Sequence, residues 1–263
     1  MKHISKITAI ALLATLSACE GSDMPIQQAD NHGYISFSAQ PQKTATRANP
    51  YEAYDPTRHP ATMGTFGYYD MPKRYASAAN TIFNNETATY NVATYGWDTA
   101  TKKRWTEYTK ASSFDFFAYM PYTGGATLLR TANNTYTLSF PFAMSDGGNP
   151  VPVIYDTKAA PIICAVPSSK GAISDSNGGG TVSLKFDQTL TGYKLLFMLG
   201  TKMNAIRHFR IKSVTLSGSF STSCTISRSY VWNTTSKSWS ASAITWSDIK
   251  RQSFVETPFP IAY

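Results

Sequence analysis

Apolar and polar residues alternate in short runs along most of this chain. The first such run is YISFSAQ at 34–40, in which Ile35, Phe37 and Ala39 alternate with serines. A period of two residues sends successive side chains to opposite faces of an extended backbone. This run therefore predicts a half-buried strand, with the three apolar residues on its buried face.

Similar runs follow at short spacing through the rest of the sequence. We expect strands in the segments 64–71, 112–123, 134–142 and 182–199, and a tryptophan-containing hairpin that turns at 98–101. No segment keeps a helical period of apolar residues over three turns. Many short strands separated by turn residues predict an all-β chain of the sandwich type.

The segment GAISDSNGGG at 171–180 is the clearest break in this pattern. It carries no apolar period and ends in three glycines. Such breaks are typical of linkers between domains. We therefore expect two β-sandwich domains in tandem, the first at 48–172 and the second at 173–263.

The first nineteen residues have the layout of an exported lipoprotein leader. Lys2 and Lys6 precede a short apolar stretch, which ends in LSAC at 16–19. The stretch is too short to span a bilayer, and its ending resembles a bacterial lipobox. We expect residues 1–18 to be removed as a signal peptide and Cys19 to be acylated as an outer-membrane anchor. The alternative is an ordinary signal peptide that happens to contain a cysteine.

Composition and charge favour an exported β-protein over a nucleic-acid-binding protein. The chain is 42% hydrophobic but only 15% charged, against about 25% charged residues in typical soluble domains. Uncharged polar residues take the place of charge, which suits an exported β-protein. The formal net charge is +8, but the basic residues are scattered rather than gathered on one segment. We therefore expect no nucleic-acid partner.

Recognisable catalytic and metal-binding motifs are absent from the sequence. There is no GxSxG, HExxH, CxxC or GxxxxGK[ST] pattern, and the chain has four histidines. DSNGGG begins like a calcium loop, but Phe186 stands where the bidentate glutamate belongs. We expect no enzymatic activity, no cofactor and no metal.

Cys164 and Cys224 both lie in strand-like segments. A disulfide between them is one interpretation in an exported protein. Burial of both as free thiols is the other, and it is favoured because free cysteine is among the most buried residue types.

Trp232, Trp239 and Trp246 recur at intervals of seven among serines and threonines. Exposed rings would make them candidate glycan contacts, whereas core packing is the more common role of tryptophan in β-proteins. Separately, Asp98-Thr99-Ala100 resembles the Asp-Ser/Thr-aliphatic O-glycosylation pattern of exported Bacteroidales proteins. Thr99 is therefore a candidate glycosylation site.

The order of these features resembles that of the fimbrillin family of Bacteroidales, the subunits of type V pili and related surface lipoproteins. After the lipobox and a tether, the resemblance is carried by ISFSA and TATRA within 35–48, FFAYMP at 116–121, and VSLKFDQTLTGYKLLFML at 182–199. It implies tandem sandwiches of the transthyretin-like, Greek-key kind. It also implies a cell-surface location, assembly into a fimbrium, and a role in adhesion to a host or bacterial ligand.

The resemblance further implies a maturation step. A trypsin-like protease would cut between Arg47 and Ala48 and free the segment 19–47, which holds the tether and the first strand. Loss of Ile35, Phe37 and Ala39 would open a groove with unpaired strand edges, and such edges accept strands from other chains. A strand from another pilin subunit would fill the groove, and repetition would build a filament.

The end of the chain departs from this scheme. Its last residues, FVETPFPIAY at 254–263, contain two prolines, which weaken a donor strand because proline has no backbone N–H. An anchor or tip subunit, which accepts a strand without donating one, is therefore an alternative to a stalk subunit. The remaining alternative is a surface lipoprotein that does not polymerise and binds glycans or host ligands.

Overall fold

The computed structural model describes residues 33–41, 60–146, 149–150, 160–173, 179–190 and 215–258. Within these ranges all regular elements are β-strands except two short 3-10 helices, η1 (Ala78–Asn80) and η2 (Trp105–Tyr108). No helix in the described ranges has the length and apolar character needed to span a membrane. The prediction of an all-β chain is confirmed in this coarse form.

The first sheet contains eight strands in the order β10-β12-β1-β4-β3-β2-β5-β11. β10 also pairs with β5 through Ile162–Met120 and Ile163–Tyr119, so that seven of these strands close into a ring. β11 continues along the same edge of β5. The strands are β1 (Phe37–Pro41), β2 (Thr62–Tyr69), β3 (Thr81–Asn91), β4 (Gly96–Thr99), β5 (Ser113–Met120), β10 (Ile162–Cys164), β11 (Ser168–Gly171) and β12 (Val182–Gln188).

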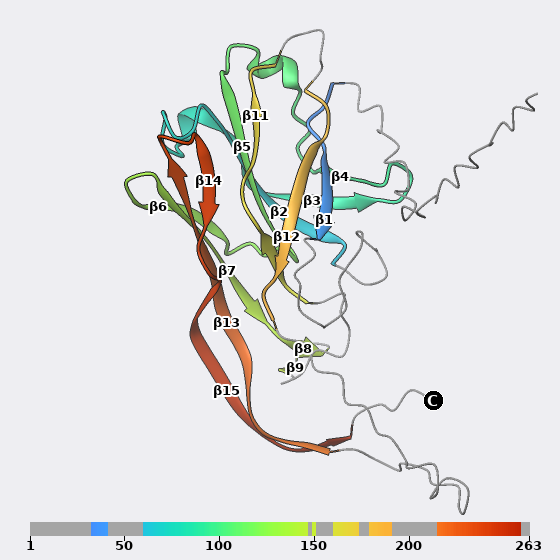
Figure 1. Cartoon of the computed structure of the whole chain (residues 1–263). Helices are drawn as coiled ribbons and strands as arrows, with labels where there is room; N and C mark the ends of the chain where they lie inside the picture. Colours follow the sequence, from blue (N-terminus) through green and yellow to red (C-terminus); the bar gives the residue numbers. More distant parts are fainter. Residues whose placement is uncertain are drawn as a thin grey trace, which may run out of the picture.

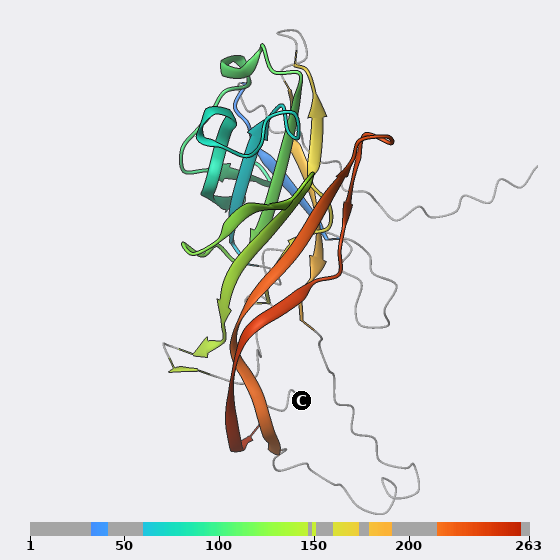
Figure 2. The same ribbon diagram turned by 90° about the vertical axis from the view of Figure 1, so that its left-hand side faces the viewer.

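The second sheet has the order β14-β13-β7-β6, and β15 also pairs with β13. Its strands are β6 (Thr127–Ala132), β7 (Thr135–Ala143), β13 (Thr215–Asn233), β14 (Ser238–Ala241) and β15 (Thr245–Pro258). A separate short pair consists of β8 (Ser145–Asp146) and β9 (Asn149–Pro150). The pairing of β13 with β7 ends at Ser223, whereas its pairing with β15 continues to Thr215. Figures 1 and 2 show this part of β13 and β15 as an arm that extends away from the other strands.

β5 joins the two sheets because both of its faces are buried. Phe116 and Phe114 point into the interior of the closed sheet, where their aromatic rings lie 6.0 and 5.3 Å from the Trp105 ring. Phe117 and Tyr119 alternate with them and meet the second sheet, at Tyr230 (5.3 Å) and Phe140 (4.4 Å). A strand covered on both sides must be apolar throughout, which explains the nearly continuous apolar run that the sequence has here.

The boundary expected near 172/173 does not separate the two sheets. β12, which was expected to begin the second domain, pairs with β1 and β10 in the first sheet, and β13 pairs with β7. Each sheet therefore contains strands from both sides of the boundary, and the tandem arrangement of two sandwiches is not confirmed.

The glycine run that suggested this boundary has a different role at its described end. Gly179 has a φ of +65°, and a Cβ placed on it would come within 2.4 Å of the Trp105 ring. The carbonyl oxygen of Gly180 accepts a hydrogen bond from Trp105 Nε1 at 3.1 Å. These glycines allow the backbone to approach a buried tryptophan closely. A flexible linker also favours glycine, but here the glycines serve close packing against the core.

The tryptophan-containing hairpin is also placed differently from the prediction. β3 and β4 pair from Asn91–Gly96 to Ala88–Thr99, so the turn lies at 92–95 rather than at 98–101. Tyr95 has a φ of +51° in this turn. The segment expected as the second strand instead contains η2, and its Trp105 is buried in the core.

Candidate assembly site at strand β1

β1 lies in the middle of the first sheet, between β12 and β4 (Figure 1). It runs parallel to β12 over five residue pairs, from Phe37–Val182 to Pro41–Phe186. On its other side it pairs antiparallel with β4 at Phe37–Trp97. The strand that was expected to be removable is therefore an internal strand of a closed ring, and its loss would leave β12 and β4 without this neighbour.

The side chains of β1 and the residues just before it enter the core as the alternation predicted. Phe37 has no exposed surface, and its ring lies edge-on to Phe83 at 5.8 Å and to Phe116 at 5.7 Å. Ile35 is buried and Ala39 is partly buried against the same core. Ser36, which the alternation placed on the exposed face, is buried as well, and its hydroxyl lies 3.3 Å from that of Thr181. Truncation of a buried phenylalanine typically costs about 3–5 kcal/mol, so Phe37 is the main side-chain anchor of the strand.

The entrance to β1 is held by the basic segment that precedes η2. The Ile35 N–H donates to the carbonyl oxygen of Lys103 at 2.8 Å, and the Trp105 N–H donates to that of Gly33 at 3.0 Å. Arg104 donates to the Tyr34 hydroxyl at 2.9 Å while its guanidinium lies 4.7 Å from the centre of the Tyr34 ring. Noncovalent backbone and side-chain contacts thus hold this end of the strand against the segment 103–105.

The other end of β1 leads to the predicted maturation site. Pro41 is the last described residue before Pro60, so Arg47 and Ala48 lie outside the described residues, as does Cys19. A cut at Arg47 would leave β1 attached through its hydrogen bonds and side-chain packing. The pocket left by its departure would be lined by Phe83 and Phe116 and bordered by two strand edges, which is the chemistry of a strand-accepting groove.

The three tryptophans proposed as glycan contacts do not form one platform. Trp232 and Trp239 occupy paired positions on β13 and β14, and their rings are 5.3 Å apart. Trp239 also packs against Phe117 at 5.7 Å. Trp246 lies on β15 opposite Ile226 and is 46% exposed. Core packing accounts for Trp239, whereas Trp246 presents its ring to solvent away from the other two.

Thr99 is 4% exposed, and its hydroxyl donates to the carbonyl oxygen of Thr101 at 3.0 Å. It pairs with Ala88 of β3. The folded chain therefore does not present this hydroxyl at its surface for glycosylation.

Asp115 is a buried carboxylate that sequence reasoning missed. It lies on β5 and accepts hydrogen bonds from the Ser169 hydroxyl of β11 and from Trp239 Nε1 of β14, the latter at 2.8 Å. Burial raises the pKa of Asp115 to about 6, and these two hydrogen bonds partly offset the effect. The available signal was an acidic residue within the apolar run SFDFFAYM, because a charge at such a position needs partners from other strands.

A second polar cluster links the sheets at β12 and β13. Arg228 Nη1 lies 2.6 Å from Asp187 Oδ2, and the same guanidinium donates to the carbonyl oxygen of Cys164 at 3.3 Å. The Tyr230 hydroxyl donates to that carbonyl oxygen at 2.7 Å. Buried ion pairs stabilise a fold weakly but penalise arrangements that separate the partners, so this cluster fixes how the sheets dock.

Both described cysteines are unpaired, as the sequence favoured. Cys164 is fully buried, and burial raises the pKa of its thiol to about 11. Cys224 is half-buried, and burial also raises its pKa. Because the thiolate is the reactive form, neither residue has the environment of a nucleophile.

Within the described ranges no group of three or more His, Cys, Asp or Glu side chains is placed to hold a metal ion. Comparisons with protein-family models, with curated proteins and with solved structures each returned no match.

Proposed function

We propose that this chain is a fimbrillin-like subunit of a cell-surface pilus, anchored at first through Cys19 and assembled by exchange of its first strand. The observation that supports the proposal most is the position of β1. β1 lies inside the first sheet with Phe37 and Ile35 in the core, and the candidate protease site at Arg47 follows it closely in the sequence. A cut there would leave the strand attached by hydrogen bonds and packing alone.

The proposed mechanism has three steps. Acylation of Cys19 places the chain on the outer membrane, and a trypsin-like protease cuts between Arg47 and Ala48. β1 then leaves, and an extended segment of another subunit takes its place between β12 and β4. Its apolar side chains would have to occupy the pocket that Phe37 and Ile35 vacate, which makes the exchange selective for alternating sequences.

The pairing of β15 with β13 bears on the place of this subunit in a filament. Pro258 is the last described residue, and it pairs with Thr215 within the β13–β15 arm. A strand already paired in this way has to leave β13 before it can be donated. This favours an anchor or tip subunit, which accepts a strand, over a stalk subunit. The tandem-sandwich architecture of the family is not required for this mechanism.

N-terminal sequencing of surface material from the native membrane tests the proposal. We expect Ala48 as the N-terminus on high-mass species that resist SDS. The variant Arg47→Ala should leave the chain as a precursor with a blocked Cys19. Arg58, in a proline-bound turn of the sequence, is the competing target for the protease, and Arg58→Ala should mature normally. A monomer with a lipid-blocked Cys19 in the unmodified protein would contradict the proposal. The surface lipoprotein that does not polymerise would then be the better account.

A further inference from the structure

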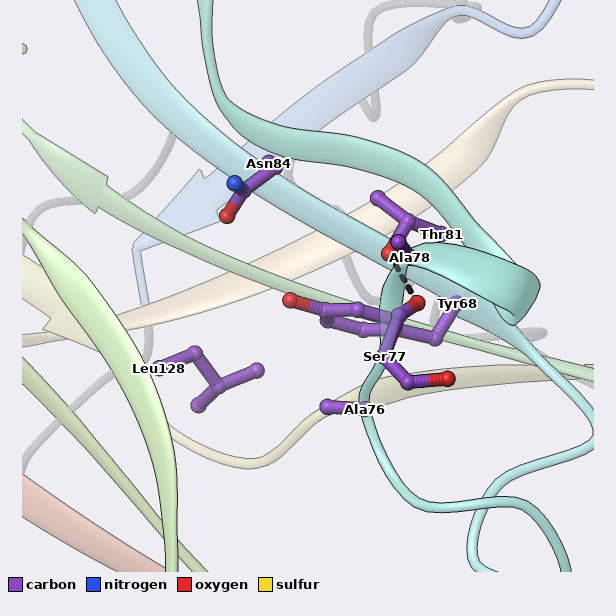
Figure 3. A pocket seen from close by; sticks show the side chains of 7 residues that line it. All are labelled: Tyr68, Ala76, Ser77, Ala78, Thr81, Asn84 and Leu128. Atoms are coloured by element: carbon purple, nitrogen blue, oxygen red, sulfur yellow. Dashed lines mark hydrogen bonds between the residues drawn. The ribbon is translucent and has the colours of Figure 1, made fainter.

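A cavity of about 470 Å³ opens beside β2 (Figure 3). It lies between β2, the segment around η1, β3 and β6, so that both sheets contribute to its walls. β4 and β3 separate β1 from β2 in the sheet order, so the cavity is distinct from the proposed assembly site. The residues that line it are Tyr68, Ala76, Ser77, Ala78, Thr81, Asn84 and Leu128.

The hydroxyl of Tyr68 has an unusual environment in this cavity. Tyr68 is 4% exposed, and Figure 3 shows its hydroxyl pointing into the space between Asn84 and Leu128. This hydroxyl makes no hydrogen bond within the part of the chain that the structure describes. The hydroxyl is not one of the buried polar atoms that lack a partner, so it is accessible from the cavity, where a ligand oxygen would replace a bound water. Burial raises the pKa of Tyr68 to about 12, so the group is a neutral donor and acceptor near pH 7.

Asn84 supplies a second free polar group at the cavity. The pairing of β2 with β3 passes from Thr65–Glu86 to Phe66–Asn84, which leaves Asn85 as the extra residue of a bulge with a φ of +52°. The side chain of Asn85 then bonds Tyr119 and Thr123, whereas Asn84 faces the cavity. Bulges commonly re-aim side chains in this way. Asn84 is exposed, and its amide offers N–H donors and a carbonyl acceptor with no protein partner among the described residues.

The remaining walls are mixed, because Ser77 and Thr81 carry hydroxyl groups that bond within the segment around η1, and the other lining residues are apolar. Leu128 is buried, Ala76 packs against the core, and the ring of Tyr68 forms part of the lining. Next to Ala76, Tyr75 is 52% exposed, and the guanidinium of Arg130 lies 3.6 Å from the centre of its ring. Arg130 also donates to Asn133 at 3.0 Å. The exposed ring of Tyr75 is thus held in place beside the cavity by a cation–π contact.

These features define the ligand by its chemistry. None of the described residues that line the cavity is charged, and its volume lies within the range of small-molecule sites. A sugar ring has an apolar C–H face for Tyr68 and Leu128, and adjacent hydroxyls for an amide and a phenol. We propose that this cavity binds a neutral sugar residue, with Tyr68 and Asn84 as its hydrogen-bonding partners and Tyr75 as a platform for a following sugar. This inference concerns a site different from the three tryptophans, and it does not depend on pilus assembly.

Saturation-transfer NMR on the intact chain tests the inference. The probes are methyl glycosides of glucose, galactose, mannose, fucose and N-acetylglucosamine, together with methyl sialoside. We expect signal transfer to at least one neutral glycoside. Tyr68→Phe and Asn84→Ala should each weaken its binding about tenfold, since each removes one hydrogen bond that the protein itself does not use.

The control separates binding from folding. Tyr68→Phe keeps the ring and removes only the hydroxyl that faces the cavity, so we expect thermal stability close to that of the parent. Tyr95→Phe, at an exposed tyrosine in the β3–β4 turn, should change neither stability nor binding. Lack of transfer to every neutral glycoside, preference for the sialoside, or binding unchanged in both cavity variants would each overturn the proposal.

Discussion

Asp115 makes the stability of this protein depend on pH. Its carboxyl group has a pKa of about 6 in the folded chain, against an ordinary value of 3.8. Between about pH 4 and pH 6 the folded chain therefore holds a proton that the unfolded chain has lost. Unfolding releases this proton, so the free energy of unfolding falls as pH rises through that window. The contribution of this proton to the free energy of unfolding is fully present below pH 4. Above pH 6 this contribution, about 3 kcal/mol, is lost.

The variant Asp115→Asn tests this dependence. Asparagine stays neutral at every pH and keeps an oxygen that can accept from Trp239 and Ser169. We expect the free energy of unfolding, measured with denaturant from pH 3.5 to 7, to lose its decline between pH 4 and 6. The variant should therefore be more stable than the parent above pH 6. A variant that keeps the parent's decline would show that another group is responsible.

At the scale of elements, the glycine run at 178–180 has two interpretations: a flexible linker between domains, or a loop that packs against the core. The positive φ of Gly179 and the nearness of the Trp105 ring leave no room for a Cβ atom. In a flexible linker the same position would accept alanine without cost. The two interpretations of this segment therefore predict different stabilities for a variant with alanine at position 179.

We expect Gly179→Ala to lower the free energy of unfolding by about 2 kcal/mol, because it adds both backbone strain and a clash with a buried ring. Gly171→Ala is the matched control, because nothing lies within 4 Å of its Cβ position, and it should change stability by less than about 0.5 kcal/mol. Equilibrium unfolding followed by tryptophan fluorescence compares the two. Equal stability of the variants would support a linker.

At the scale of the whole molecule, each of the two sheets combines strands from the N-terminal and C-terminal halves of the chain. β1 pairs with β12 in one sheet, and β7 pairs with β13 in the other. Arg228–Asp187 and the Asp115–Trp239 hydrogen bond cross between the sheets. Neither half of the chain contains a complete sheet, so we expect the chain to unfold as one cooperative unit.

The fragment 48–172, which the sequence suggested as a complete domain, tests this cooperativity. It lacks β1, β12 and β13, so β10 and β7 each lose one of their two neighbouring strands. We expect it to show no cooperative thermal transition, whereas the intact chain shows coincident transitions by circular dichroism and by tryptophan fluorescence. A sharp transition in the fragment would restore the independent domain.

The sequence alone determined the secondary-structure class and the burial of individual strands. The alternation in 34–40 correctly placed Ile35 and Phe37 in the core, and the apolar run at 112–123 marked the central strand β5. Both signals are local, since the side-chain period of a strand is set by its own backbone geometry. Such a pattern identifies which face of a strand is buried.

The tertiary structure decided what lies against each buried face. Backbone hydrogen bonds can join any two strands, so no local pattern indicates that β1 pairs with β12. For the same reason, no local pattern indicates that strands before and after 171–180 belong to the same sheet. The partners of Asp115 come from β11 and β14, and the cavity at Tyr68 is walled by β2, β3 and β6. A buried charge, an unpartnered hydroxyl and a cavity are properties of contacts between distant segments. They exist only after the chain has folded.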